Sequence, residues 1–302
     1  MNYTFHQLRV FLEVVKQKSV TRAAEEMHMT QPALSIQLRN FQAQFDMPLV
    51  EVVNKRIYVT EFGREIAEIA ESVLREADEI EFKMKEYQGL LAGKLKISSA
   101  STGKYVIPYF LSEFMETHSG VDLVLDVTNK TKVINSLRDN EIDFALVTLV
   151  PQDLDVNEEP LVENKLYFVG NNEDFNKDKP LIYREEGSAT RTLMERHFGR
   201  SKKRKRLELT TTEAVKQAVI AGLGYSVVPL IGIRNELSNG QMRIIPSPGL
   251  PIVNKWRLVW RKDKKQSAVA KAYLQYIRDK KSIIVRNSFQ WYLDFNEKKR
   301  RH

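Results

Sequence analysis

The chain has 302 residues, of which 42% are hydrophobic and 28% are charged. This apolar content argues against a disordered protein. The sequence contains no run of about 18 apolar residues, so it predicts no membrane-spanning helix. At roughly 100–200 residues per domain, the length predicts two or three compact units. The amino terminus lacks a basic segment followed by an apolar stretch, so we expect a cytoplasmic protein with no membrane partner.

The residue types on which much enzyme chemistry depends are scarce. The sequence has no cysteine, and its five histidines are scattered without the spacing of metal ligands. We also find no pair of residues that would serve as nucleophile and base. We therefore expect no metal site, no cofactor and no enzymatic activity.

The formal net charge of +8 suggests a nucleic-acid partner, but its distribution weakens that argument. Residues 255–302 carry 15 basic and 4 acidic side chains, whereas residues 1–92 carry 11 basic and 14 acidic side chains. A basic tail is more often a solvated end than a DNA groove. DNA binding therefore has to be argued from a motif.

Short helices are predicted for the first 45 residues. An amphipathic first helix is followed by Ser19, a good N-cap for a second helix over residues 20–27. Thr30 or Gln31 caps a third helix, with Pro32 at its first position, and this helix runs to about residue 45. Its inward positions are apolar and its outward face is polar.

A hairpin and a long helix come next. Two β-rich segments, residues 49–53 and 57–60, are joined by a basic tip. From residue 62 to residue 91, apolar side chains recur in steps of three and four, close to a heptad seam, and most other positions are charged. One long helix explains this pattern, and its seam predicts a dimer.

After Gly93, strands and helices alternate, which predicts a parallel sheet with helical crossovers. The expected strands are residues 95–99, 121–127, 144–147, 166–169, 181–183, 207–209, 225–228 and 257–260. The expected helices are residues 105–116, 132–140, 189–198, 212–221 and 269–278.

The first ninety residues carry a family resemblance. Residues 19–39 (Ser-Val-Thr-Arg-Ala-Ala-Glu-Glu-Met-His-Met-Thr-Gln-Pro-Ala-Leu-Ser-Ile-Gln-Leu-Arg), followed by Pro48-Leu49 and Thr60-Glu61-Phe62-Gly63, resemble the LysR-type bacterial transcriptional regulators. The resemblance covers almost the whole chain, more loosely after residue 92. It implies an α+β multidomain protein with an N-terminal winged helix-turn-helix, a long linker helix and a C-terminal two-lobed α/β effector domain that is periplasmic-binding-protein-like.

Domain boundaries follow from this resemblance. The winged helix-turn-helix would occupy residues 1–60 and the linker and dimerisation helix residues 61–92. The effector-binding domain would occupy residues 93–302. Within it, lobe I would comprise about 93–165 and 266–302, and lobe II about 166–265.

A recognition helix beside a wing predicts which side chains meet DNA. Gln31 is the best candidate base reader, because an amide both donates to and accepts from an adenine edge. The expected DNA-binding residues are Thr21, Arg22, Thr30, Gln31, Pro32, Ser35, Ile36, Arg39, Lys55 and Arg56. Thr21 and the basic members are expected at phosphates, with the minor groove as an alternative for Arg56. Ile36 stands where many relatives carry Arg or Lys, and Val-Glu-Val at 50–52 replaces the family's common Phe-Glu-Arg.

Hydroxyl and amide side chains follow several expected strands at turns into helices, where backbone N–H groups and the helix dipole favour an anion. The expected effector-binding residues are Ser101, Thr102, Lys104, Asn129, Thr131, Thr148, Ser188 and Thr211. Plain helix capping is the alternative for each serine and threonine. The turns at residues 101–105 and 129–131 resemble those of the subgroup that regulates carbon-fixation operons, whose effectors are phosphorylated metabolites. A small anionic metabolite is therefore the expected ligand.

Together these features predict a sequence-specific transcription regulator that binds double-stranded DNA and a small-molecule effector, with RNA polymerase as a further candidate partner. The linker helix predicts a homodimer, and the resemblance suggests a homotetramer. The alternative is a small-molecule-binding protein or an enzyme that uses the α/β half, with the N-terminal helices as a protein-interaction module. For the basic run at residues 200–206, a second nucleic-acid contact and a phosphate trap stay open, although we favour a solvated loop.

Overall fold

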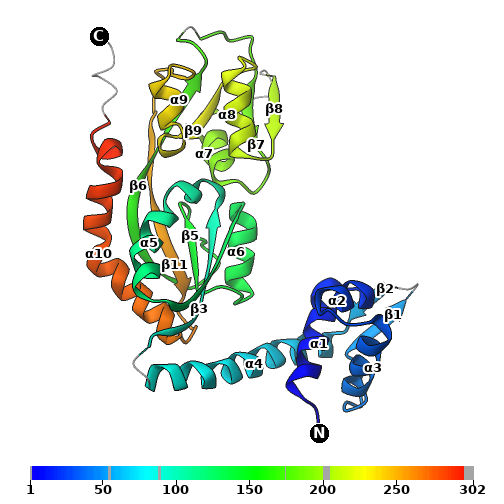
Figure 1. Ribbon diagram of the computed structural model, residues 1–302. Helices are drawn as coiled ribbons and strands as arrows, with labels where there is room; N and C mark the ends of the chain where they lie inside the picture. The colour runs from blue at the N-terminus through cyan, green and yellow to red at the C-terminus, as the bar shows by residue number, and fades with distance from the viewer. Residues whose placement is uncertain (1, 54–55, 88–89, 174, 200–204, 296–302) are drawn as a thin grey trace. The chain divides into compact units, whose positions relative to one another are not determined.

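A computed structural model describes residues 2–53, 56–87, 90–173, 175–199 and 205–295 of the chain (Figure 1). The chain divides into two compact units, residues 1–90 and 91–302. Each unit has a hydrophobic core of its own.

Three helices open the first unit: α1 (Phe5–Gln17), α2 (Val20–Glu26) and α3 (Gln31–Gln42). Ser19 and Thr30 cap α2 and α3, because their hydroxyls accept hydrogen bonds from backbone N–H groups of the first helical turn. Between the two helices His28 adopts a left-handed conformation with φ of 53°. The predicted second and third helices are therefore confirmed, although α3 ends about three residues earlier than expected.

The hairpin of the first unit is also confirmed. Strands β1 (Val50–Val53) and β2 (Arg56–Val59) pair antiparallel. The core includes side chains from α1, α3 and the start of α4 (Glu61–Tyr87), among them the fully buried rings of Phe11 and Phe41, whose centroids are 5.2 Å apart. Buried aromatic rings contribute much of a small core's stability. They hold one face of α3 inward, and its polar face is left outside.

The apolar seam of the long helix α4 is partly buried in the first unit and partly exposed. Phe62 and Ile66 belong to the core of the first unit. Farther along, Ile69, Val73 and Ile80 are exposed by 59%, 38% and 66%. The seam expected along the whole helix is therefore available to a partner only after its first turns, because those turns pack against the unit itself. Seam positions 84 and 87 lie beyond the side chains that the structure describes.

The second unit is built on a mixed sheet. Its strands are β3 (Ala92–Ala100), β4 (Gly120–Thr128), β5 (Phe144–Val147), β6 (Val156–Gly170), β9 (Ser226–Pro229), β10 (Arg243–Ile244) and β11 (Ile252–Arg261), with β7 (Leu181–Arg184) and β8 (Arg206–Leu209) as a separate pair. The main order is β10-β6-β11-β5-β3-β4, with β9 also on β6. The expectation of a parallel sheet holds for β3 with β4 and β5 and for β7 with β8. Strands β6, β9, β10 and β11 instead pair antiparallel because the chain returns through long strands, and the sequence pattern did not predict β10.

Two lobes are joined by β6 and β11, which run through both (Figure 1). Lobe I has β3, β4 and β5 with helices α5 (Ile107–Thr117), α6 (Lys130–Arg138) and α10 (Ala268–Leu293). Lobe II has β7 to β10 with α7 (Ala189–Phe198), α8 (Thr212–Ile220) and α9 (Arg234–Ser238). The short 3₁₀ turns η1 (Ser101–Tyr105) and η2 (Leu230–Gly232) follow β3 and β9.

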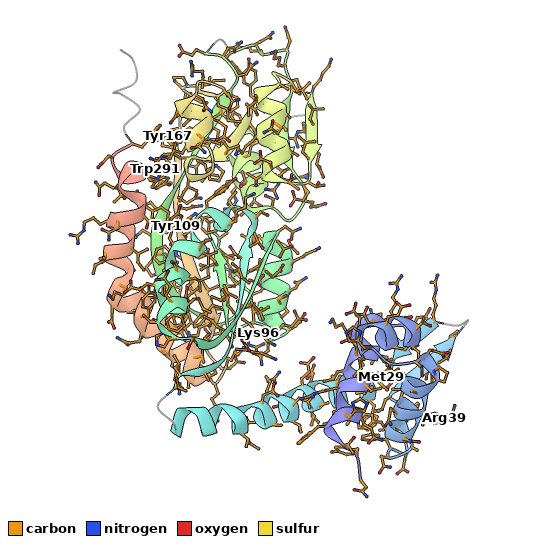
Figure 2. The ribbon with its side chains drawn as sticks, viewed as in Figure 1. Met29, Arg39, Lys96, Tyr109, Tyr167 and Trp291 are labelled. Atoms are coloured by element: carbon orange, nitrogen blue, oxygen red, sulfur yellow. The ribbon has the colours of Figure 1, made fainter. Side chains whose placement is uncertain are left out.

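Helix α10 is longer than its sequence pattern predicts. It continues past residue 278 to Leu293, with a non-helical residue at Phe289. Beyond that break the Tyr292 hydroxyl accepts a hydrogen bond from the backbone N–H of Lys165 in β6. The ring of Trp291, which is labelled in Figure 2, has its centre 4.9 Å from the guanidinium carbon of Arg234 in α9. These tertiary contacts, rather than helical periodicity, explain the extension. No helix in the described part of the chain is long and apolar enough to span a bilayer.

Candidate functional site

The outward face of α3 is the first candidate site. Its exposed residues are Gln31, Pro32, Ile36, Arg39 and Asn40, and the capping residue Thr30 is exposed beside them. Gln31 Nε2 donates a long hydrogen bond of 3.4 Å to Ser35 Oγ, so this amide and hydroxyl share one face of the helix. Arg39 projects away from the unit (Figure 2). Such a face offers hydrogen-bond donors and acceptors to base edges in a major groove.

The expected phosphate contacts are distributed around α3. Thr21 and Arg22 are exposed in the first turn of α2, and Arg56 is exposed at the start of β2. Lys55, also expected at DNA, lies outside the described residues. These positions suit contacts to the phosphate backbone of DNA, which fix the orientation of a recognition helix.

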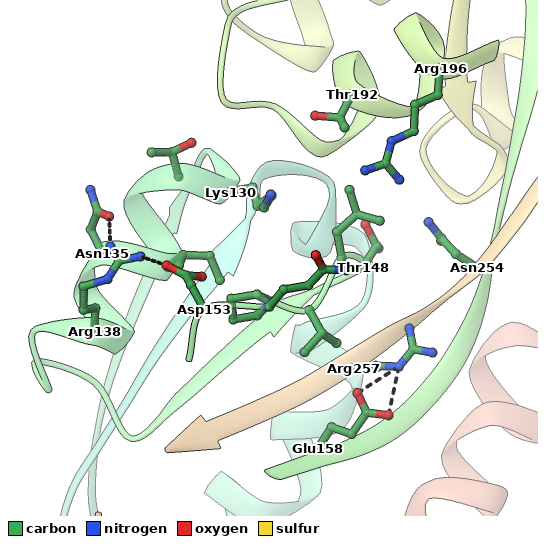
Figure 3. A pocket seen from close by; sticks show the side chains of 16 residues that line it. Lys130, Asn135, Arg138, Thr148, Asp153, Glu158, Thr192, Arg196, Asn254 and Arg257 are labelled. Atoms are coloured by element: carbon green, nitrogen blue, oxygen red, sulfur yellow. Dashed lines mark hydrogen bonds and ion pairs between the residues drawn. The ribbon is translucent and has the colours of Figure 1, made fainter. Parts of the chain in front are cut away.

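The second candidate site is a cavity of about 650 Å³ in the second unit (Figure 3). Lobe I lines it with α6 and the loop after β5, lobe II lines it with α7, and β11 contributes residues from the strand that joins the lobes. Ligand sites commonly lie between lobes in this way, near the carboxyl ends of parallel strands.

Positive charge is in excess in this cavity. Its ionisable side chains are Lys130, Arg138, Arg196, Arg257, Asp153 and Glu158. Arg138 pairs with Asp153 at 2.7 Å, and Arg257 pairs with Glu158 at 3.3 Å. The hydrogen bond from Arg138 holds the pKa of Asp153 below its ordinary value, so this carboxylate stays charged.

Lys130 and Arg196 differ from the two paired arginines. Neither side chain makes a salt bridge or hydrogen bond to another residue in the described part of the chain. Lys130 begins α6 in lobe I, and Arg196 lies in the last turn of α7 in lobe II. The cavity thus presents from each lobe one cation that no carboxylate pairs directly, although Lys130 also helps to lower the pKa of Asp153, and this arrangement suits an anion that touches both lobes.

The structure separates the predicted effector residues. Thr131 and Thr148 line the cavity, and Thr148 is buried. The other six are not among the lining residues: Ser101, Thr102, Lys104, Asn129, Ser188 and Thr211. The side chains of Asn129 and Thr211 cap α6 and α8, and for Thr211 this is the capping alternative stated for the serines and threonines. The Lys104 ammonium lies 5.1 Å from the centre of the Tyr105 ring.

Some predicted residues connect the lobes. The buried guanidinium of Arg184 in lobe II donates to Ser101 Oγ of lobe I at 3.2 Å and pairs with Glu185 at 2.7 Å. Thr131 Oγ1 in lobe I donates to the Gly187 carbonyl in lobe II at 3.4 Å. Gly187 has a φ of 85°, and a Cβ there would lie 2.5 Å from Thr131 Oγ1, so this contact requires glycine.

Sequence reasoning missed several residues of the second site. Lys130 belongs to a predicted turn and could have been found from its neighbours Asn129 and Thr131. Arg138, Arg196 and Arg257 lie inside regular elements, where no local signal distinguishes them from surface cations. Within the described residues, no group of His, Cys, Asp or Glu could hold a metal ion.

The basic run at residues 200–206 is only partly described. Residues 200–204 lie outside the described part, as do residues 296–302 of the basic tail. Arg206 begins β8, where its guanidinium lies 4.7 Å from the centre of the Tyr183 ring and donates to the Gly199 carbonyl. The solvated loop favoured for this run therefore does not extend to Arg206.

Two family models match the chain. The bacterial regulatory helix-turn-helix of the LysR family matches residues 5–64, and the LysR substrate-binding domain matches residues 88–282. Among curated relatives, the RuBisCO operon transcriptional regulator of Allochromatium vinosum is 35% identical over 295 residues, covering 92% of this chain and 96% of the relative.

Solved structures agree with the family models. The regulatory domain of Synechocystis CcmR in complex with 2-PG is 28% identical, with a TM-score of 0.55, and covers 62% of this chain and 96% of that chain. Full-length CbnR complexed with its target DNA has a TM-score of 0.63 at 17% identity, covering 91% of this chain and 99% of that chain. The second likeness supports the fold alone. With both family models matched in order along the sequence, the chain belongs to the LysR family of DNA-binding transcriptional regulators.

Proposed function

We propose that this regulator binds a small anionic metabolite between the lobes of its second unit, and that the bound metabolite changes how the first unit binds DNA. The observation that carries the proposal is that Lys130 and Arg196, two cations without a salt-bridge partner among the described residues, line one cavity from opposite lobes. An anion held by both would favour one relative orientation of the lobes. A ligand shifts a conformational equilibrium only when it binds the two states differently, and a bridging contact provides that difference.

The chemistry of the cavity favours a ligand that carries phosphate or more than one carboxylate. Two formal positive charges remain after the Arg138 and Arg257 pairs are set aside. The hydroxyl of Thr148 adds a neutral hydrogen-bond donor, whereas the hydroxyls of Thr131 and Thr192 donate to the carbonyls of Gly187 and Ser188. The similarity to a CcmR domain that holds 2-PG supports this class, and similarity to a RuBisCO operon regulator supports a role in carbon-fixation gene control.

DNA binding is assigned to the first unit. Gln31 and Ser35 would read bases from α3, with Thr21, Arg22, Arg39 and Arg56 at phosphates. The exposed apolar residues of α4 would pair two copies, and a tetramer would form through the second units. Two linked helix-turn-helix heads read two half-sites, so the assembly would determine the spacing that the operator needs.

Calorimetric titration of the full chain with 2-PG and with inorganic phosphate tests the ligand proposal. Lys130→Gln and Arg196→Gln each remove one charged hydrogen-bond donor, which is worth about 1.5–3 kcal/mol, so each should weaken binding about tenfold or more. Lys271→Gln and Arg286→Gln are matched controls, because they remove the same charges from exposed positions of α10.

The comparison among these variants decides the outcome. Equal weakening in the cavity variants and the α10 controls would show that only net charge matters, which contradicts a site at the cavity. The link to DNA is measured by operator binding with and without ligand, which should differ for the wild type and not for the cavity variants.

A further inference from the structure

A pair of asparagine side chains lies where the two lobes join. Asn164 of β6 and Asn254 of β11 are directly opposite in the antiparallel ladder, and Asn164 Nδ2 donates to Asn254 Oδ1 at 2.8 Å. On one side of this pair, β6 continues into pairing with β9 of lobe II, at residues 166–169. On the other side, β11 pairs with β5 of lobe I, at residues 257–259. The two amides therefore lie at the passage between lobes.

This pair leaves hydrogen-bonding capacity unused. Both Asn254 Nδ2 and Asn164 Oδ1 are buried without a hydrogen-bond partner among the described residues. Leaving a buried polar atom unpaired destabilises a protein, so such atoms need an explanation. Asn254 lines the cavity, and its amide nitrogen points from β11 into the space between Arg196 and Thr148 (Figure 3).

We infer that Asn254 is a specificity-determining residue of this site, whose Nδ2 donates a hydrogen bond to an anionic oxygen of the bound effector. The inference rests on the proposed function and adds to it a donor that belongs to neither lobe. Because Asn164 Nδ2 already donates to Asn254 Oδ1, the N–H donors of Asn254 are oriented toward the cavity. A ligand bound to Asn254 would lie beside β6 and β11, the strands that join the lobes, with Lys130 and Arg196 contacting it from lobe I and lobe II.

Asn254→Asp is the direct test. The substitution keeps the shape of the side chain and replaces the N–H donor with a carboxylate oxygen that repels an anion. Affinity for 2-PG should fall about 10–100-fold, the range expected for a hydrogen bond to a charged group. Asn157→Asp is the matched control, because it adds the same charge at an exposed position of β6 outside the cavity, and its affinity should stay within twofold of the wild type.

A second variant separates ligand recognition from a structural role. Replacing both amides with leucine, a residue of similar shape, removes two unpaired buried atoms together with the one hydrogen bond between them. The Asn164→Leu/Asn254→Leu protein should unfold at the same temperature as the wild type or higher, yet bind 2-PG at least tenfold more weakly. A structural role would instead lower the unfolding temperature.

The possible results are distinct. Wild-type affinity in Asn254→Asp, or an equal loss in Asn157→Asp, overturns the inference and leaves the proposed function in place. A marked loss of stability with retained binding in the double leucine variant also overturns it. If the wild type binds neither 2-PG nor inorganic phosphate, the proposed function fails and the inference fails with it.

Discussion

The two candidate sites of this regulator differ in how they are built. The surface of α3 is made by one short stretch of chain, so that Gln31, Ser35 and Arg39 share a face simply because of helical spacing. The cavity of the second unit takes its cations from α6, α7 and β11, which are far apart in the sequence. A site on one helix can be read from its motif, whereas a site assembled from several elements depends on how they pack.

The largest expected effect concerns α4, the long helix of the first unit. Ile69→Asp with Val73→Asp places two charges on the exposed apolar stripe of α4 and should give monomers that no longer protect operator DNA, because a lone head loses half of its contacts. Sedimentation and footprinting measure this.

Arg75→Asp is a matched control for that double variant. It changes the net charge by the same two units, at an exposed position away from the apolar stripe, and it should remain dimeric. A dimeric mass for Ile69→Asp with Val73→Asp would show that the stripe is not the interface.

An intermediate effect is expected from the recognition helix. Gln31→Ala should weaken specific operator binding by about 1–3 kcal/mol and leave binding to random DNA nearly unchanged, because the amide reads a base rather than a phosphate. Competition assays with operator and random duplexes give both values. An equal loss on random DNA would mean that Gln31 contacts the backbone and that the α3 site is not read as its motif suggests.

The smallest expected effect distinguishes two predicted effector residues. Thr148→Val removes a hydroxyl from the cavity and should weaken 2-PG binding several-fold, in keeping with about 0.5–1.5 kcal/mol for a neutral hydrogen bond. Thr102→Val changes a buried residue that is not among the lining residues and should leave affinity unaltered. Titration of both variants decides between them. A loss of affinity in Thr102→Val with none in Thr148→Val would indicate that the ligand binds near η1, at the turn after β3 that the sequence analysis proposed.

The sequence by itself determined the helix-turn-helix, its caps, the wing and the long linker helix. These features depend on local signals, such as Ser19 and Thr30 at N-caps and regular apolar spacing along α4. It also gave most strands and helices of the second unit within a few residues. Local periodicity was enough there because each of these elements buries one regular face.

Tertiary structure alone decided the rest. The antiparallel return of β6 and β11 and the extension of α10 beyond residue 278 follow from contacts such as the one between Tyr292 and Lys165, which join distant parts of the chain. The same holds for the division of the α4 seam and for the meeting of Lys130, Arg196 and Asn254 at one cavity. The physical reason is that hydrogen-bond pairing, burial and charge compensation are properties of pairs of residues, and only folding determines which residues become neighbours.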